Sequence, residues 1–174
     1  VARAIIDLLP FEDIVYFGDT SRYPYGPQPL EEVKSYSEQI SDYLIAEHDV
    51  KMIVIACNTA SAAAEDDLRN STEIPIVGVI TPGAQAVAEV SSTKKIGVIG
   101  TVGTINSQAY DNAIKGISPE NIELVSVACP GFVEFVERGE FEGEQVRILA
   151  DRLLAPVIQA DVDALLLGCT HYPY

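Results

Sequence analysis

The feature that most constrains the fold is an apolar stretch that runs directly into a cysteine and then into a helix. Residues 52–55 read Met-Ile-Val-Ile, which is typical of a short strand covered on both faces. The alanine-rich residues 60–64 favour a helix. Cys57 is therefore predicted at the carboxyl end of a parallel strand, the edge where open α/β sheets place their ligands.

The residues after Cys57 give this corner a possible chemistry. Asn58 and Thr59 are residue types that cap helix N-termini, and the first N–H groups of a helix have no intrahelical partner. Such a corner can accept a carboxylate, and it is expected to lower the pKa of a thiol. The alternative is that Cys57 is a small apolar plug, because unpaired cysteine is among the most buried residue types. For this stretch taken alone, the alternative is the favoured interpretation.

A second copy of the arrangement lies near the end of the chain. Residues 164–168 form an apolar strand that runs into Cys169, Thr170 and His171. Two such corners suggest two thiols that face one ligand. His171 either activates the neighbouring thiol or base, or is a surface or capping histidine. Cys169 and His171 are only two residues apart, which is a poor spacing for zinc ligands, so no metal site is predicted.

The rest of the chain alternates between strand and helix patterns. This alternation predicts an α/β fold with parallel sheets, divided near residues 91–94 into a first lobe, 1–91, and a second lobe, 92–174. Pro156 is expected to interrupt the last helix. The expected strands span 13–17, 52–55, 75–80, 95–100, 122–128 and 164–168, and the expected helices outside the first corner span 1–9, 30–47, 82–90, 106–115, 132–138 and 142–159.

Composition excludes several kinds of partner. The net charge of −15, from 26 acidic and 11 basic residues, disfavours nucleic acid and anionic membranes. No apolar run approaches the roughly 18 residues of a membrane span. The 3 cysteines are widely spaced, which fits free thiols in a reducing compartment better than a disulfide framework. We therefore expect a cytoplasmic location.

Other motifs are weaker. The glycines of residues 97–104 suggest a phosphate loop, but its spacing and lysine are lacking, so a tight strand-to-helix turn is favoured. The hydroxyls of Thr101 and Thr104 could still bind a carboxylate. Glu137 is either a carboxylate near the site or, as the sequence alone favours, a solvated helix residue. Cys129 precedes a proline and is expected to be structural.

Two segments together resemble the paired signatures of glutamate racemases, within the Asp/Glu racemase superfamily. They are Ala-Cys-Asn-Thr-Ala-Ser at 56–61 and Gly-Cys-Thr-His-Tyr-Pro at 168–173. Residues 170–172 differ from those that follow the second cysteine in aspartate and hydantoin racemases. Supporting matches, in the family's order over nearly the whole chain, are Gly-Asp-Thr at 18–20, Pro-Tyr-Gly at 24–26, Ile-Gly-Thr at 99–101 with Thr104, and Cys-Pro through Val-Glu at 129–137.

The resemblance implies two flavodoxin-like lobes with the active site in the cleft between them. It implies a two-base racemisation of glutamate without a cofactor, in which Cys57 and Cys169 lie on opposite faces of the substrate Cα. Cys57 would deprotonate D-glutamate, and Cys169, assisted by His171, would deprotonate L-glutamate. Substrate-binding residues implied by the same resemblance are Tyr25, Gly26, Asn58, Thr59, Thr101, Thr104, Thr170 and Glu137.

The same resemblance implies a homodimer that supplies D-glutamate for peptidoglycan. Family members usually open with a strand ending in Asp-Ser-Gly and continue beyond the position of Tyr174, so we expect this chain to be part of a longer protein. A competing hypothesis is a catalytically inactive amino-acid binding or regulatory module of the same fold. Racemisation through pyridoxal phosphate is disfavoured, because none of the lysines lies at a predicted strand-end corner.

Overall fold

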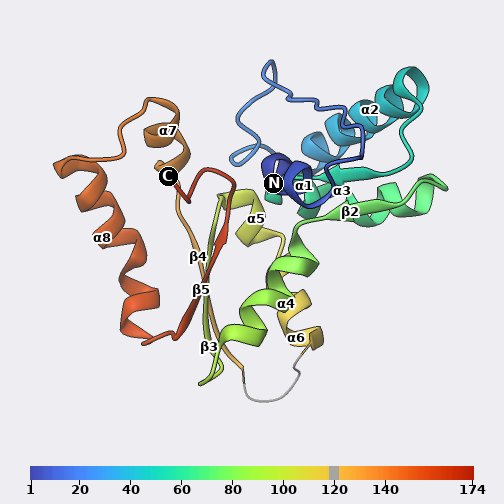
Figure 1. The fold of residues 1–174 in the computed structure, drawn as a ribbon. Coiled ribbons are helices and arrows are strands. Elements are labelled where there is room, and N and C mark those ends of the chain that lie inside the picture. The colour runs from blue at the N-terminus through green and yellow to red at the C-terminus, as the bar shows by residue number, and fades with distance from the viewer. Residues whose placement is uncertain (118–121) are drawn as a thin grey trace.

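A computed structural model describes residues 1–117 and 122–174, and within them the strands form two parallel sheets (Figure 1). The first sheet pairs β1 (Ile53–Ile55) with β2 (Ile76–Gly78). The second has the order β4-β3-β5, with β3 (Lys95–Gly100) between β4 (Glu123–Ala128) and β5 (Ala164–Gly168). The predicted α/β class with parallel sheets is confirmed.

The register of the second sheet brings three chain corners to one edge. Gly100 pairs with Ala128 on one side and with Gly168 on the other. Because the strands are parallel, the residues that follow them, Thr101, Cys129 and Cys169, leave the sheet at the same carboxyl edge.

The helices of the first half are α1 (Ala2–Leu8), α2 (Leu30–His48) and α3 (Asn58–Ser71) (Figure 1). Of these, α3 packs on the smaller sheet, α2 packs on α3, and α1 has no buried residue. The buried core here joins the first sheet to the inner face of α3 through Ile53, Ala64, Leu68 and Ile76.

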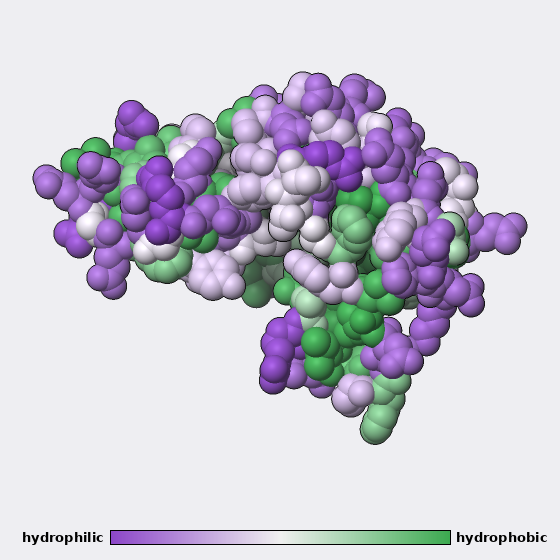
Figure 2. All heavy atoms as spheres, turned by 90° about the horizontal axis from the view of Figure 1, so that it is seen from above, coloured by the Kyte–Doolittle hydropathy of each residue, from purple (hydrophilic) through white to green (hydrophobic). Residues whose placement is uncertain are grey.

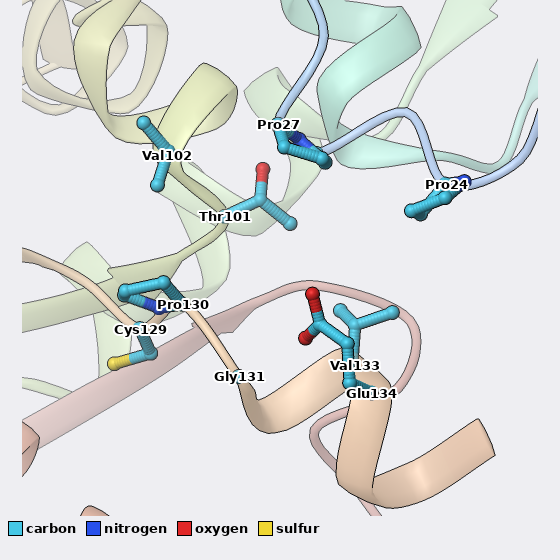
Figure 3. Close-up of a pocket in the computed structure, with 10 residues that line it drawn as sticks. Pro24, Pro27, Thr101, Val102, Cys129, Pro130, Gly131, Val133 and Glu134 are labelled. Atoms are coloured by element: carbon cyan, nitrogen blue, oxygen red, sulfur yellow. The ribbon is translucent and has the colours of Figure 1, made fainter. Parts of the chain in front are cut away.

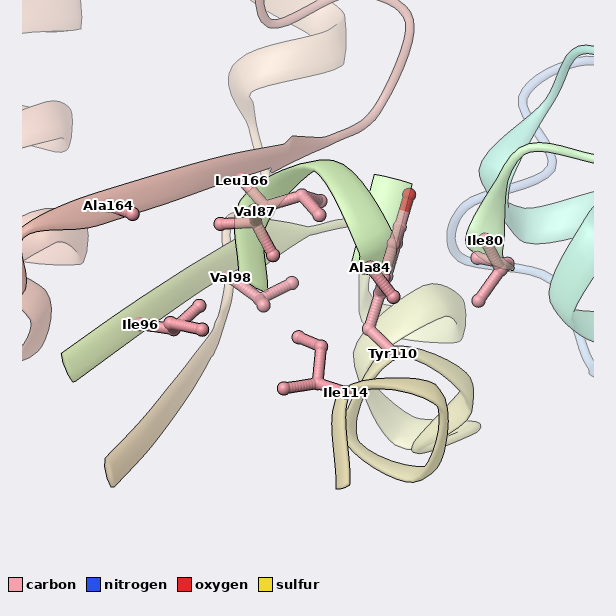
Figure 4. Close-up of a cluster of buried hydrophobic side chains, with 9 residues drawn as sticks. All are labelled: Ile80, Ala84, Val87, Ile96, Val98, Tyr110, Ile114, Ala164 and Leu166. Atoms are coloured by element: carbon pink, nitrogen blue, oxygen red, sulfur yellow. The ribbon is translucent and has the colours of Figure 1, made fainter. Parts of the chain in front are cut away.

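The second sheet is covered on both faces (Figure 1). On one side lie α4 (Ile80–Val90) and α6 (Ala109–Ile117), and on the other lies α8 (Glu144–Gln159). Two short helices, α5 (Val102–Asn106) and α7 (Phe132–Glu137), follow the carboxyl ends of β3 and β4. The largest core cluster, drawn in Figure 4, consists of Ile80, Ala84, Val87, Ile96, Val98, Tyr110, Ile114, Ala164 and Leu166.

The packing of α4 bears on where the chain divides. Its residues Ile80, Ala84 and Val87 belong to the core of the second sheet, whereas the sequence placed this helix in a first lobe ending at residue 91. The packing therefore favours a junction near Val79. The division into two domains stays a prediction.

Two expected elements differ in the structure. Residues 13–17 pair with no strand in the described part of the chain, and Phe17 is 45% exposed, so the β-branched pattern alone did not make a strand. The single helix expected over 106–115 is split into α5 and α6, because Gln108 adopts a left-handed conformation with φ 57°.

The expected interruption of the last helix at Pro156 is also wrong. α8 runs continuously from Glu144 to Gln159 with Pro156 inside it. Proline removes one backbone N–H, and near the end of a helix this affects only one hydrogen bond of the last turn. The helix therefore continues to Gln159.

The surface seen in Figure 2 is mostly hydrophilic, and hydrophobic residues gather on one projecting part of it. Many exposed large apolar side chains belong to the first 17 residues, including Phe11, which is 99% exposed. Among the residues that the structure describes, no helix combines the length and the apolar character needed to cross a membrane.

The carboxylate of Asp163, which precedes β5, forms hydrogen bonds with the connection between α4 and β3. Asp163 accepts hydrogen bonds from Ser91 Oγ at 2.6 Å, from the Ser92 N–H at 2.7 Å and from the Thr93 N–H at 2.6 Å. The hydrogen bonds from Ser91 and the Thr93 N–H hold the pKa of Asp163 well below its usual range. The carboxylate form therefore stabilises the fold.

We expect Asp163→Asn to lower the melting temperature at pH 7, because an amide cannot accept all of these bonds. A depressed pKa contributes stability above the unfolded-state value of about 3.9, and this contribution is lost as the pH falls through the lower folded-state value. The difference between the two proteins should therefore shrink progressively below about pH 4. Thermal melts from pH 7 to pH 2.5, with the exposed Asp151→Asn as control, would measure it, and a difference independent of pH would contradict the assignment.

Candidate active site

Cys57 is itself the residue that precedes the first helical residue of α3. The helix begins at Asn58, so the predicted capping positions of Asn58 and Thr59 are wrong by one or two residues. The N–H groups of Thr59 and Ala60 lie near the sulfur and favour its thiolate, because they are among the unpaired donors of the first turn. The corner thus points donors at a sulfur.

Burial nevertheless decides the protonation of this thiol. Removal from water raises the pKa of Cys57 above its usual value, and the donors from Ala60 and Thr59 only partly oppose this effect. The expectation that the corner lowers a thiol pKa is therefore wrong. A helix N-terminus favours an anion by a modest amount, whereas burying a thiolate costs more.

At the second corner, His171 contacts both Cys169 and Glu137. Cys169 is buried, and its Sγ lies 3.7 Å from Nδ1 of His171. Nε2 of the same ring lies 2.6 Å from Oε1 of Glu137, which belongs to α7. The Glu137 side chain is half exposed, yet its carboxylate fixes the imidazole, so it is more than a solvated helix residue. Its predicted contact with substrate stays a prediction.

The two candidate thiols affect each other electrostatically. Burial, and after it the charge of Cys57, raise the pKa of Cys169 to about 11, while the N–H groups of His171 and Thr170 oppose the shift. A second negative charge is therefore disfavoured once the first is present. The charge of one thiolate therefore opposes ionisation of the other thiol.

The loop before α2 is held together by Asp19, which belongs to the Gly-Asp-Thr match at 18–20 but was not predicted as a site residue. Asp19 accepts hydrogen bonds from Tyr25 Oη at 2.5 Å, from Arg22 Nε at 2.5 Å and from Ser21 Oγ at 3.0 Å. Burial raises the pKa of Tyr25, and the charges of Asp19 and Cys57 add to the effect. The predicted site residue Tyr25 therefore lies within electrostatic reach of the first thiol.

Polar contacts connect the predicted site residues of the two sheets. The hydroxyls of Thr59, Thr101 and Thr104 are buried and mutually hydrogen-bonded, with Oγ1 to Oγ1 distances of 2.9, 3.2 and 2.9 Å. The N–H of Gly103 donates to the carbonyl of Gly26 at 2.9 Å. These contacts bring Gly26, Thr59, Thr101 and Thr104 together as predicted, although they bond to one another.

Two tyrosines near the thiols were missed. Tyr110 Oη donates to Asn58 Oδ1 at 2.6 Å. The Tyr23 ring centroid lies 6.0 Å from that of His171, and burial and the charge of Glu137 raise the pKa of Tyr23 to about 12. No local signal identified either residue, since their partners are far away in the sequence.

Two pockets lie beside these residues. One lies between the 24–27 loop and the edge of the second sheet, where Figure 3 shows Thr101 and Glu134 among its lining residues. The other is lined by Val136, Glu137, Phe141, Thr170, His171 and Tyr174. Over residues 1–117 and 122–174, no three His, Cys, Asp or Glu side chains gather where they could hold a metal ion.

Cys129 follows a strand at the same sheet edge, but its side chain belongs to a hydrophobic core cluster. It is 1% exposed and packs with Ile99 and Val157 on the α8 side of the sheet. Burial raises its pKa to about 11. It packs as a core residue, and it also lines the pocket beside the 24–27 loop.

The fold and the site define an α/β protein with two coupled thiols, each placed where a parallel strand ends. The family model described as Asp/Glu/Hydantoin racemase matches residues 1–174. The chain belongs to this family.

Named relatives agree with the family. The chain is 49% identical over 173 residues to a glutamate racemase of Parafrankia sp., which covers 99% of this chain and 62% of the relative. A crystal structure of a Bacillus anthracis glutamate racemase superimposes with a TM-score of 0.94 at 43% identity, over 99% of this chain and 64% of that one. A crystal structure of a Francisella tularensis glutamate racemase in complex with D-glutamate superimposes with a TM-score of 0.91 at 40% identity. The match covers 99% of this chain and 64% of that one. The predicted resemblance to glutamate racemases is confirmed, and the chain spans less than two thirds of the length of these relatives.

The raised thiol pKa predicts how Cys169 reacts with alkylating reagents. Since the thiolate is the nucleophile, the alkylation rate should still rise about tenfold per pH unit between pH 8 and pH 10. Peptide mass spectrometry after short exposure to iodoacetamide would follow Cys169, with N-acetylcysteine in the same tube as reference. A plateau of the Cys169 rate near pH 8 would contradict the effect of burial.

Proposed function

We propose that the protein containing this chain interconverts L-glutamate and D-glutamate by proton transfer between two thiols. The observation that carries the proposal is the placement of Cys57 and Cys169, each where a parallel strand ends, with the charge of Cys57 reaching Cys169. The similarity to glutamate racemases, one of them crystallised with D-glutamate, supports glutamate as the substrate.

The reaction needs one group that acts as a base and another that acts as an acid, and in this proposal both are cysteine side chains. The thiolate of one cysteine takes the α-proton and becomes a thiol, and the thiol of the other gives a proton to the opposite face and becomes a thiolate. We propose that Cys57 deprotonates D-glutamate and Cys169 deprotonates L-glutamate. No electrons are gained or lost, and the roles reverse in the return direction.

His171 and Glu137 are proposed to assist the second thiol. The imidazole contacts Sγ of Cys169 and can support its change of charge, while the Glu137 carboxylate holds the ring in place. Glu137 therefore acts through His171 in this proposal.

The substrate is proposed to lie against the first turn of α3. The N-terminal end of this helix favours a carboxylate, which matters in a chain with a net charge of −15. The proposed substrate-binding residues are Tyr25, Gly26, Asn58, Thr59, Thr101, Thr104, Glu137 and Thr170.

The biological setting is proposed from the same resemblance. D-glutamate would serve peptidoglycan synthesis, and the 3 cysteines, all unbonded thiols, fit a reducing compartment such as the cytoplasm. A homodimer also stays a prediction, as does the absence of nucleic-acid and membrane partners.

Serine at either cysteine should abolish most racemisation, because a hydroxyl is too weak an acid and base for this transfer. We expect Cys57→Ser and Cys169→Ser each to lower the rate by roughly two to four orders of magnitude in the protein that contains this chain. Circular dichroism of glutamate solutions would measure interconversion. The buried Cys129→Ala is the matched control and should keep the rate.

Exchange of the α-proton in deuterium oxide would assign the faces. Cys57→Ser should still exchange L-glutamate, and Cys169→Ser should still exchange D-glutamate, since each keeps the base for one face. Near-normal racemisation by either serine variant would contradict the roles. Binding of glutamate by the unaltered protein without any exchange would favour the inactive module instead.

A further inference from the structure

One buried side chain contacts both cysteine corners. Tyr110, on α6, is 4% exposed, and its Oη donates a hydrogen bond of 2.6 Å to Oδ1 of Asn58, which is 7% exposed. Asn58 directly follows Cys57 and opens α3. The hydroxyl end of Tyr110 is thus one residue away from the first thiol.

The ring of the same tyrosine packs against the residue that precedes the second thiol. A side chain at Gly168 would place its Cβ 3.2 Å from Cε2 of Tyr110, and one at Gly83 would meet the opposite ring edge at 3.2 Å. These glycines let the backbone approach the ring closely. Figure 4 shows Tyr110 extending from α6 into the cluster that contains Leu166 of β5.

The hydrogen bond sets the orientation of the Asn58 amide. Because Oδ1 accepts from Tyr110, Nδ2 with its two N–H donors lies on the other side of the amide. Burial and the charge of Cys169 raise the pKa of Tyr110, so the hydroxyl keeps its proton and remains a donor. The Tyr110 hydroxyl therefore remains a hydrogen-bond donor at neutral pH.

We propose that Tyr110 is a positioning residue that fixes the Asn58 amide for substrate binding and links the two thiol corners through its ring. The proposal rests on the proposed function, in which Asn58 contacts glutamate. Tyr110 itself touches no reacting atom. Its effect reaches the substrate through Asn58 and through the backbone at Gly168.

Tyr110→Phe tests the hydroxyl while keeping the ring. In the protein that contains this chain, we expect KM for both enantiomers of glutamate to rise about tenfold with kcat changed less than about threefold, because the lost orientation weakens binding throughout the reaction. A purely structural defect would instead lower the active fraction and leave KM unchanged. Tyr43→Phe, which removes an exposed hydroxyl on α2, is the control and should change neither constant.

A double-mutant cycle with Asn58→Ala tests whether Tyr110 acts through Asn58. Once Asn58 is alanine, Tyr110→Phe should have no further effect on KM. Additive effects of the two changes, or an unchanged KM in Tyr110→Phe, would overturn the proposal.

Calorimetric binding of glutamate to the same variants separates this proposal from the proposed function. If the unaltered protein binds glutamate without exchanging its α-proton, and both single variants weaken binding to the same extent, racemisation fails and the positioning role stands. If the unaltered protein racemises glutamate while Tyr110→Phe matches it in affinity, only the positioning role fails. If the unaltered protein neither binds nor exchanges glutamate, both fail.

Discussion

The low tendency of Cys57 and Cys169 to ionise together is the constraint on which the site depends. Burial opposes ionisation of Cys57 and Cys169, and the charge of the first raises the pKa of the second. Backbone N–H groups at both corners oppose these effects only in part. A negative charge on one sulfur therefore opposes ionisation of the other, so the two sulfurs do not share the same role in one step of the reaction.

The relative position of the corners depends on contacts between α3 and the second sheet. The hydroxyl of Thr59 reaches Thr101 and Thr104, and Asn58 reaches Tyr110. These contacts all involve the first turn of the helix that Cys57 opens. Displacement of this turn would therefore change both the donors around the first sulfur and its distance from the second.

The sequence predicted the corners because each is a local event. An apolar run followed by a cysteine and polar residues indicates a strand end, and β1 and β5 end where this pattern places them. The same local reasoning failed at residues 13–17, where a strand-like composition finds no partner in the described chain.

Long-range contacts explain the rest of the differences. Glu137 and His171 lie 34 residues apart, and Tyr110 and Asn58 lie 52 residues apart, so no helical or strand periodicity relates them. The thiol pKa was misjudged for a similar reason. The first-turn N–H groups can be read from a helix start, whereas the burial that outweighs them is produced by the assembled sheets.

The most direct test of the central claim is a crystal structure, with glutamate bound, of the protein that contains this chain. We expect Sγ of Cys57 and Sγ of Cys169 to lie on opposite faces of the substrate Cα, each at roughly the 3–4 Å of a reactive approach. Both sulfurs on the same face, or either one separated from Cα by another side chain, would contradict the two-thiol account.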